Sequence, residues 1–204
     1  MTNQSVMRAI WRFLLSLALS IFTGSYLLAG MAKAQESSSS STVKVRLIGE
    51  NGSLTEPVTV PRVKKTDAEW RKQLTAEQYE IARGQGTEPA FCGTLLDNHR
   101  EGIYHCVCCG LPLFASDSKF NSGTGWPSFF QPVAKENVIT RVDDSYGMRR
   151  TEIICARCGA HLGHVFDDGP APTGLRFCLN SAALTFVDKG KEIPEVVVHS
   201  AQAK

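Results

Sequence analysis

Two short cysteine motifs constrain the fold of this chain more than any other feature. Each has the form C-x-x-C-G, and they occupy residues 106–110 and 155–159. A two-residue gap lets a tight turn aim both sulfurs at one point, and the glycine can adopt the left-handed backbone that closes the turn. Two such turns supply the four thiolates of a tetrahedral site, so the spacing predicts one structural zinc ion per chain. The expected ligands are Cys106, Cys109, Cys155 and Cys158.

A disulfide framework is the alternative to a metal site for these cysteines, since oxidising compartments favour disulfides. The chain has seven cysteines, all after residue 91, and an odd number leaves at least one thiol unpaired. Paired C-x-x-C-G turns are also more typical of zinc knuckles than of disulfides. The metal interpretation leaves Cys92, Cys108 and Cys178 as the thiols in which chemistry should be sought.

The first 34 residues have the layout of a secretory signal peptide. Arg8 and Arg12 precede an apolar run at 13–29, and Ala32-Lys33-Ala34 has the small-x-small form of a cleavage site. We expect cleavage after Ala34 and export, with the periplasm as the expected compartment. The alternative is a retained membrane anchor formed by residues 13–29, because this run approaches the length of about 18 residues that a spanning helix needs.

The remaining residues are enough for one domain with a hydrophobic core. Residues 35–65 are expected to form a polar linker and an extended lead-in with one or two short strands. A single domain follows over residues 66–190, and residues 191–204 form a C-terminal tail. The formal net charge of +2 is too small to indicate a nucleic-acid partner. We expect a monomer.

Capping boxes predict two short helices, near residues 67–74 and 76–83. In each box a threonine, Thr66 or Thr75, precedes Glu69 or Gln78 by three residues. The side chains expected to be buried from these helices are Trp70, Leu74, Tyr79 and Ile81. From residue 90 onward, glycine and proline recur too often for an amphipathic helix, and short apolar runs have a β-rich composition. Those runs are residues 138–142, 151–154, 175–179 and 183–187. The fold class is therefore mainly β and mostly antiparallel.

The segment Arg176-Phe177-Cys178-Leu179-Asn180 is the first candidate for chemistry. Alternate residues of a strand share a face, so Arg176, Cys178 and Asn180 project together, away from a core that takes Phe177 and Leu179. A guanidinium and an amide beside a thiol form an environment that favours a reactive thiolate. A buried structural cysteine is the other interpretation, and the local pattern alone leaves both open.

Two histidines and a tryptophan are further candidates. His161 and His164 follow the second knuckle three residues apart; they could bind metal, but four thiolates are already available, which favours a role in proton transfer near neutral pH. Trp126 lies in an aromatic Gly/Pro-rich segment, Gly123 to Phe130, that forms either a pocket wall or part of the core.

The motif series as a whole resembles that of the B-type methionine-R-sulfoxide reductases. The resemblance runs from about Trp70 to Phe186 and keeps the family's motif order. The motifs that carry it are Gly86-Thr87-Glu88-Pro89-Ala90-Phe91, the Cys106/Cys109 knuckle, Gly125-Trp126-Pro127-Ser128-Phe129, Arg150-Thr151-Glu152, the Cys155/Cys158 knuckle, His161-Leu162-Gly163-His164-Val165-Phe166 and Arg176-Phe177-Cys178-Leu179-Asn180-Ser181.

The resemblance implies two antiparallel sheets, short N-terminal helices and a structural zinc bound by the four knuckle cysteines. It implies that Cys178 is the nucleophile that reduces methionine-R-sulfoxide, free or in proteins, through a sulfenic acid. By the same similarity, Trp126 packs on the substrate methyl group. The remaining pocket residues that it implies are His161, His164, Arg176 and Asn180.

The second, resolving thiol departs from the commoner family pattern. Many members carry this cysteine immediately before the Gly-Trp-Pro motif, where this chain has Thr124. A minority place it where this chain has Cys92, so the resemblance implies a Cys178–Cys92 disulfide that a thioredoxin-like partner reduces. Cys108 lies inside the first knuckle and is a weaker candidate.

Two other functional classes compete with a reductase. One is a zinc-ribbon-like binding module in which Cys178 is inert. The other is a zinc enzyme such as a deaminase, but four thiolates leave no open coordination position and the H-x-E signature is absent. A fast-reacting thiol in the metal-loaded protein distinguishes a reductase from a binding module.

Overall fold

The computed structural model describes residues 41–49 and 52–191, all within the second of two compact units into which the chain divides, Met1–Ser39 and Ser40–Lys204. The predicted signal peptide or anchor and most of the predicted C-terminal tail lie outside the described residues. Within the described part, none of the helices is long and apolar enough to cross a membrane.

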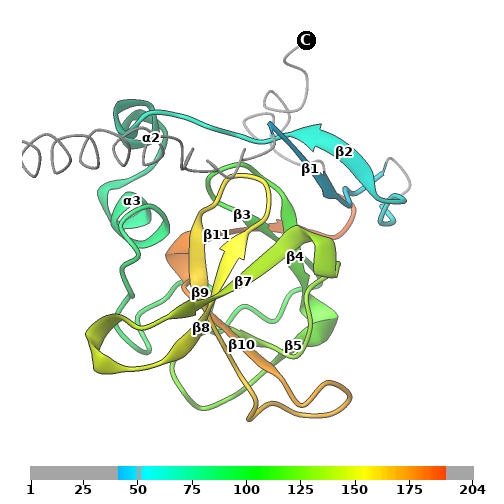
Figure 1. Cartoon of the computed structure of the whole chain (residues 1–204). Coiled ribbons are helices and arrows are strands. Elements are labelled where there is room, and N and C mark those ends of the chain that lie inside the picture. The colour runs from blue at the N-terminus through cyan, green and yellow to red at the C-terminus, as the bar shows by residue number, and fades with distance from the viewer. Residues whose placement is uncertain (1–40, 50–51, 192–204) are drawn as a thin grey trace, which may run out of the picture. The chain divides into compact units, whose positions relative to one another are not determined.

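Two short helices lie between the first two strands of the chain and the strands of the two larger sheets, and they begin where the capping boxes predict. Helix α2 spans Asp67–Gln73 and helix α3 spans Ala76–Ala82. In both, the threonine side chain and the side chain of the third helical residue accept hydrogen bonds from backbone N–H groups. Helix α3 packs against the larger sheet, to one side of the strands (Figure 1). The four side chains predicted to be buried from these helices are all buried: Trp70, Leu74, Tyr79 and Ile81.

The domain is mainly β and every strand pairing in the described residues is antiparallel, which confirms the predicted fold class. A six-stranded sheet has the order β5-β6-β10-β9-β8-β7, a three-stranded sheet has the order β11-β3-β4, and a separate β1-β2 hairpin forms the lead-in. The strands are β1 (Thr42–Val45), β2 (Val58–Pro61), β3 (Gly102–Cys106), β4 (Pro112–Ala115), β5 (Lys119–Phe120), β6 (Ser128–Phe129), β7 (Val138–Asp143), β8 (Arg150–Cys155), β9 (His161–Phe166), β10 (Arg176–Leu179) and β11 (Leu184–Asp188).

Aromatic side chains join the two larger sheets. The ring of Phe129 on β6 lies 4.9 Å from Tyr104 on β3 and 4.9 Å from Phe114 on β4, measured between ring centroids. Phe114 also lies 5.6 Å from Phe177 on β10. Because Phe177 and Leu179 both enter this core, the intervening residue of β10 must project from the opposite face of the sheet.

Close pairing of β9 with β10 depends on one glycine. A Cβ atom at Gly163 would lie 2.0 Å from the carbonyl oxygen of Cys178, and the φ angle of Gly163 is +152°. Any side chain there would push the two strands apart, so only glycine allows β9 and β10 to pair this closely. This pairing places His164 of β9 directly opposite Cys178.

Candidate active site and metal centre

Cys178 lies on β10, near the middle of the six-stranded sheet, and its thiol is partly exposed. In the strand register it faces Ser128 on β6 and His164 on β9. Residues directly opposite one another share a face, so this register extends into a row that crosses all six strands. The row consists of Phe120, Ser128, Cys178, His164, Glu152 and Arg141.

Arg176 brings positive charge to Cys178 from two residues earlier on the same strand. Its guanidinium donates two hydrogen bonds to Asp168, of 2.8 and 2.9 Å, and lies 4.4 Å from the ring centroid of Phe166. Burial raises the pKa of the Cys178 thiol above its ordinary value, while the charge of Arg176 opposes that rise. The charge of Arg176 therefore favours the thiolate form, which burial disfavours.

Each histidine is paired with a carboxylate. The Nδ1 atom of His161 lies 2.6 Å from Oε1 of Glu152, and Nε2 of His164 lies 2.7 Å from Oδ2 of Asp143. Burial lowers the pKa of His161, and Glu152 only partly offsets this effect. The His161 ring is therefore neutral near pH 7, and it donates its Nδ1 proton to Glu152. Arg141 forms an ion pair with the other oxygen of Glu152.

The second nitrogen of His161 is left for a ligand. Nε2 is buried and has no hydrogen-bond partner among the described residues. The His161 and His164 rings lie 5.4 Å apart in an edge-to-face arrangement. A buried ring nitrogen without a partner is costly in a folded protein, so its presence next to His164, which faces Cys178, indicates a binding position for a polar atom.

Trp126 and Asn180 are both held through Glu88. The indole Nε1 of Trp126 donates to the carbonyl of Glu88 (3.0 Å), which leaves the ring partly exposed. The side-chain oxygen of Asn180 accepts from the Glu88 backbone N–H (3.0 Å), and its amide group donates to the carbonyl of Leu162 (3.2 Å). Asn180 therefore ties together the end of β10, β9 and the 88–93 loop.

Cys92 lies in an exposed turn close to the loop that carries Trp126. The preceding residue, Phe91, donates its backbone N–H to the carbonyl of Gly125 (2.8 Å). Phe91 adopts a φ angle of +66° and is largely exposed. Cys92 and Cys178 are both free thiols in this structure. The 88–93 loop and the Gly-Trp-Pro motif thus border the same site, although they are far apart in the sequence.

A separate cluster of buried cysteines could hold a metal ion. The sulfurs of Cys106, Cys109, Cys155 and Cys158 all lie within 4.8 Å of one another, and each residue is buried. Cys106 ends β3 and Cys155 ends β8, so the cluster joins the three-stranded sheet to the six-stranded sheet. Cys108 is buried but is not part of this four-sulfur group. The spacing of the two knuckles therefore predicted the cluster.

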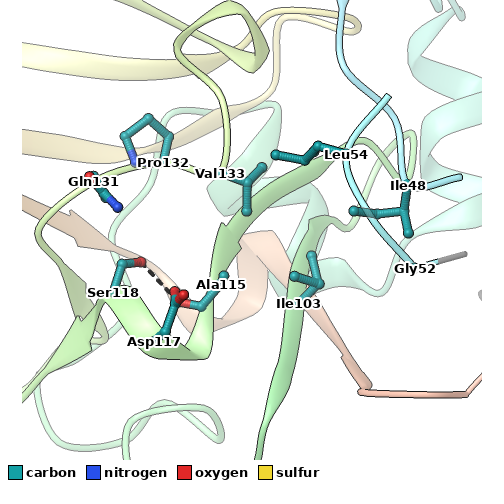
Figure 2. A pocket seen from close by; sticks show the side chains of 10 residues that line it. All are labelled: Ile48, Gly52, Leu54, Ile103, Ala115, Asp117, Ser118, Gln131, Pro132 and Val133. Atoms are coloured by element: carbon teal, nitrogen blue, oxygen red, sulfur yellow. Dashed lines mark hydrogen bonds between the residues drawn. The ribbon is translucent and has the colours of Figure 1, made fainter. Parts of the chain in front are cut away.

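A hollow that includes neither the Cys178 site nor the four-cysteine cluster lies between the β1–β2 lead-in and the β3–β4 strands (Figure 2). Its volume is about 200 Å³, and no cysteine or histidine lines it. Its lining residues are Ile48, Gly52, Leu54, Ile103, Ala115, Asp117, Ser118, Gln131, Pro132 and Val133. It lacks the thiol and the paired histidines of the Cys178 site, so that site is the better candidate for catalysis.

Some residues of the site escaped the sequence analysis. Asp143 and Asp168, which pair with His164 and Arg176, lie in none of the motifs singled out. The strand His161–Phe166 was not predicted either. Its two histidines need polar partners, and neighbouring strands supply them. Glu152 and Ser128 stood within recognised motifs but had no assigned role, because strand register, which sets their neighbours, cannot be read from one sequence.

The family model of the SelR domain matches residues 74–188 of this chain. A protein from Hahella chejuensis named peptide methionine sulfoxide reductase MsrB is 58% identical over 125 residues, which cover 61% of this chain and 90% of that protein. Proteins of the same name from Leptospira interrogans and Methanosarcina barkeri are 58% and 52% identical, over 95% and 93% of their lengths and 61% and 64% of this chain. This chain belongs to the MsrB family of peptide methionine sulfoxide reductases.

Proposed function

We propose that this protein reduces methionine-R-sulfoxide to methionine, with Cys178 as the nucleophile. The observation that carries the proposal is the position of Cys178: a partly exposed thiol on an inner strand, beside Arg176 and directly opposite His164. A purely structural cysteine needs neither a guanidinium nor a histidine as a neighbour. Membership of the MsrB family supports the same reaction.

In the first step the Cys178 thiolate attacks the sulfoxide sulfur. The sulfur–oxygen bond breaks, the oxygen and a proton end on Cys178 as a sulfenic acid, and the thioether of methionine leaves. The substrate sulfur is reduced by two electrons and the cysteine sulfur is oxidised by two. Arg176 stabilises the attacking thiolate, and His161 and His164 lie where they can exchange protons with the departing oxygen.

Trp126 and Asn180 orient the substrate in this proposal. The partly exposed indole offers a flat apolar surface for the methyl group, and its hydrogen bond to the carbonyl of Glu88 prevents the ring from turning away. Asn180 fixes the end of the strand that carries the nucleophile. The unpartnered Nε2 of His161 accepts hydrogen bonds in the neutral ring, so it is a position for a water that donates to it and bridges to the sulfoxide oxygen.

In the second step Cys92 attacks the sulfenic acid, which releases water and forms a Cys178–Cys92 disulfide. A thioredoxin-like dithiol then reduces this disulfide by exchange. The exposure of Cys92 and the backbone hydrogen bond from Phe91 to Gly125 support this assignment, because they keep the thiol in the loop that borders the site.

The metal in the four-cysteine cluster is zinc in this proposal, one ion per chain. A tetrahedral ion with zinc–sulfur bonds of about 2.3 Å separates its ligands by about 3.8 Å. The sulfur pairs Cys106–Cys158 and Cys109–Cys155 lie 3.6 and 3.5 Å apart, close to that value. Four protein ligands leave no open position for substrate, so zinc would supply structure, and the chemistry belongs to Cys178.

The N-terminal segment leads us to propose export, with the periplasm as the compartment. This proposal of export rests only on the sequence of residues 1–34: its charged start, its apolar run and its small-x-small cleavage site. Fractionation of cells that express the full chain, together with N-terminal sequencing of the product, tests it. A mature N-terminus at Gln35 in the periplasm is the expected result, and an uncleaved protein in the membrane would contradict cleavage.

Mass spectrometry after one turnover without reductant tests the catalytic proposal. The protein is mixed separately with the R and S epimers of a methionine sulfoxide peptide and of the free amino acid. We expect methionine and a Cys178–Cys92 disulfide only with the R epimers. A metal-loaded protein in which no thiol reacts rapidly with iodoacetamide would instead support a zinc-ribbon-like binding module.

A further inference from the structure

A group of three hydroxyls lies beside Cys178 on the side away from the histidines. Ser128 is fully buried on β6 and directly opposite Cys178 in the register. The hydroxyl of Ser122 lies 2.8 Å from that of Ser128 and 2.8 Å from that of Thr124. Ser128 also donates to the carbonyl of Trp126 (3.2 Å). The three side chains therefore form one connected chain next to the thiol.

One end of this chain, Ser128, lies directly opposite Cys178 in the strand register. Burial raises the pKa of the Cys178 thiol, and Arg176 and the hydroxyls of Thr124 and Ser128 oppose that rise. The hydroxyl of Ser122 joins these two residues to each other. The thiolate, which is the reactive form, thus has two potential hydroxyl donors that share a common neighbour.

The number of protons limits how this chain can be used. Three hydroxyls carry three protons, and the two contacts between them require two. One hydroxyl proton remains, and it can be donated in a hydrogen bond either to the carbonyl of Trp126 or to Cys178. When Cys178 is a thiol, it can donate to Thr124 while the chain ends on Trp126. When Cys178 is a thiolate, one end of the chain must turn its proton toward sulfur.

We propose that Ser122, Thr124 and Ser128 form a hydroxyl chain that supplies one hydrogen-bond donor to the Cys178 thiolate and reorients when the thiol loses its proton. This inference rests on the proposed role of Cys178 as the nucleophile. It deepens that role by naming the groups that prepare the thiolate from the β6 side, where Ser128 lies directly opposite Cys178.

Other charged and titratable groups surround Cys178 and act independently of the chain. Arg176 on β10 is paired with Asp168, and His164 on β9 is paired with Asp143. His161 with Glu152 lies beyond His164, and the 88–93 loop contributes Glu88 and Cys92. None of these pairs includes a hydroxyl of the chain, so substitutions in the chain leave the nearby charges unchanged.

The proton count makes a specific prediction about mutants. In Ser128→Ala, Ser122 can still donate to Thr124, and Thr124 to Cys178. In Thr124→Val, Ser122 can still donate to Ser128, and Ser128 to Cys178. Each single variant therefore keeps one donor and shifts the pKa of Cys178 by only a few tenths of a unit, whereas the double variant loses both donors. We expect the double variant to raise that pKa by about one unit or more.

The pH dependence of Cys178 alkylation by iodoacetamide measures this pKa. The rate is read at the Cys178 peptide by mass spectrometry, in a Cys92→Ser background so that the second thiol does not interfere. Ser118→Ala is the matched control, because Ser118 is a buried serine outside the hydroxyl chain, and its hydroxyl donates to the carbonyl of Ala115 (2.9 Å; Figure 2). It should leave the profile unchanged.

Small single shifts with a large double shift support the chain. An unchanged profile in the double variant would mean that the hydroxyls serve only structure. Two sizeable single shifts that add in the double variant would mean that Thr124 and Ser128 donate independently, which also overturns the chain. The assay needs no sulfoxide, so it remains informative even if the wild-type protein fails to reduce methionine-R-sulfoxide, a failure that would count against the proposed function instead.

Discussion

The carboxylate of Glu88 accepts hydrogen bonds from the backbone N–H groups of Ser181, at 2.6 Å, and Ala182, at 2.9 Å. Glu88 is buried, and no basic side chain pairs with it among the described residues. Its two oxygens satisfy the first backbone donors of the short helix, Ser181–Ala183, that follows β10. One side chain thereby fastens the loop of Cys92 to the strand of Cys178.

We predict that Glu88→Gln destabilises the protein by about 1–3 kcal/mol, because the amide presents an N–H group where a backbone N–H needs an acceptor. The loosened loop should also slow formation of the Cys178–Cys92 disulfide more than the attack on the sulfoxide. Urea unfolding measures the first effect, and single-turnover mass spectrometry measures the second. Glu77→Gln, on the exposed face of α3, is the control and should change stability by less than about 0.5 kcal/mol. Equal stability of both variants would show that the Glu88 contacts contribute nothing.

The sequence was sufficient to predict the parts of this fold that depend on local spacing. The two capping boxes placed α2 and α3 within one residue of their observed ends, and the C-x-x-C-G repeats identified the four-cysteine cluster that could hold a metal ion. Alternation along 176–180 predicted that Phe177 and Leu179 enter the core. The capping boxes and the strand alternation involve residues only a few positions apart in the sequence. The four cysteines are far apart in the sequence, but their shared ability to bind metal identifies them as a group.

The parts that could not be predicted depend on pairings between distant segments. Ser128 and Cys178 are fifty residues apart, and only the β6–β10 register makes them neighbours. The same holds for Asp143 and His164, which belong to β7 and β9 and meet across β8. A shift of one residue in any of these pairings would turn the side chains to the other face, and no local pattern specifies that register.

Thr124 occupies the position at which many relatives were expected to carry the resolving cysteine, and its hydroxyl opposes the rise that burial causes in the pKa of Cys178. We predict that Cys92→Ser retains the first turnover but loses repeated turnover with a thioredoxin system. Adding Thr124→Cys in the Cys92→Ser background should restore repeated turnover, because a thiol at 124 would lie beside the sulfenic acid. The measurement is methionine formed per protein over time.

Cys108→Ser is the control for this series, since Cys108 is a buried thiol outside the proposed pair. It should support repeated turnover at close to the wild-type rate. Continued turnover by Cys92→Ser would exclude Cys92 as the resolving thiol. The double variant could instead fail to turn over repeatedly, with no disulfide between Cys178 and the introduced thiol in its peptides. That result would show that position 124 cannot reach the sulfenic acid.

Removal of zinc should weaken the connection between the two larger sheets, because the four cysteines end β3 and β8 and follow them directly. Binding of an ion present at about a thousand times its dissociation constant contributes about 4 kcal/mol to stability. We expect a chelator, or Cys155→Ser, to lower the unfolding free energy by at least that order and to release one zinc per chain. Metal analysis measures the zinc that is released, and thermal unfolding measures the loss of stability. A protein purified without zinc but with an unchanged melting temperature would contradict a structural metal.

Activity should rise with pH from neutral to mildly alkaline values, because burial raises the pKa of Cys178 and the thiolate is the species that attacks. Arg176 opposes that rise, so Arg176→Gln should raise the pKa by about one further unit and reduce the single-turnover rate near pH 7 about tenfold. The lost rate should return at higher pH, where the thiolate forms without help from the guanidinium. Arg149→Gln removes an exposed arginine whose ion pair is with Asp144, and it should leave the profile in place. A loss of activity in Arg176→Gln that is the same at every pH would mean that Arg176 positions the substrate and does not stabilise the thiolate.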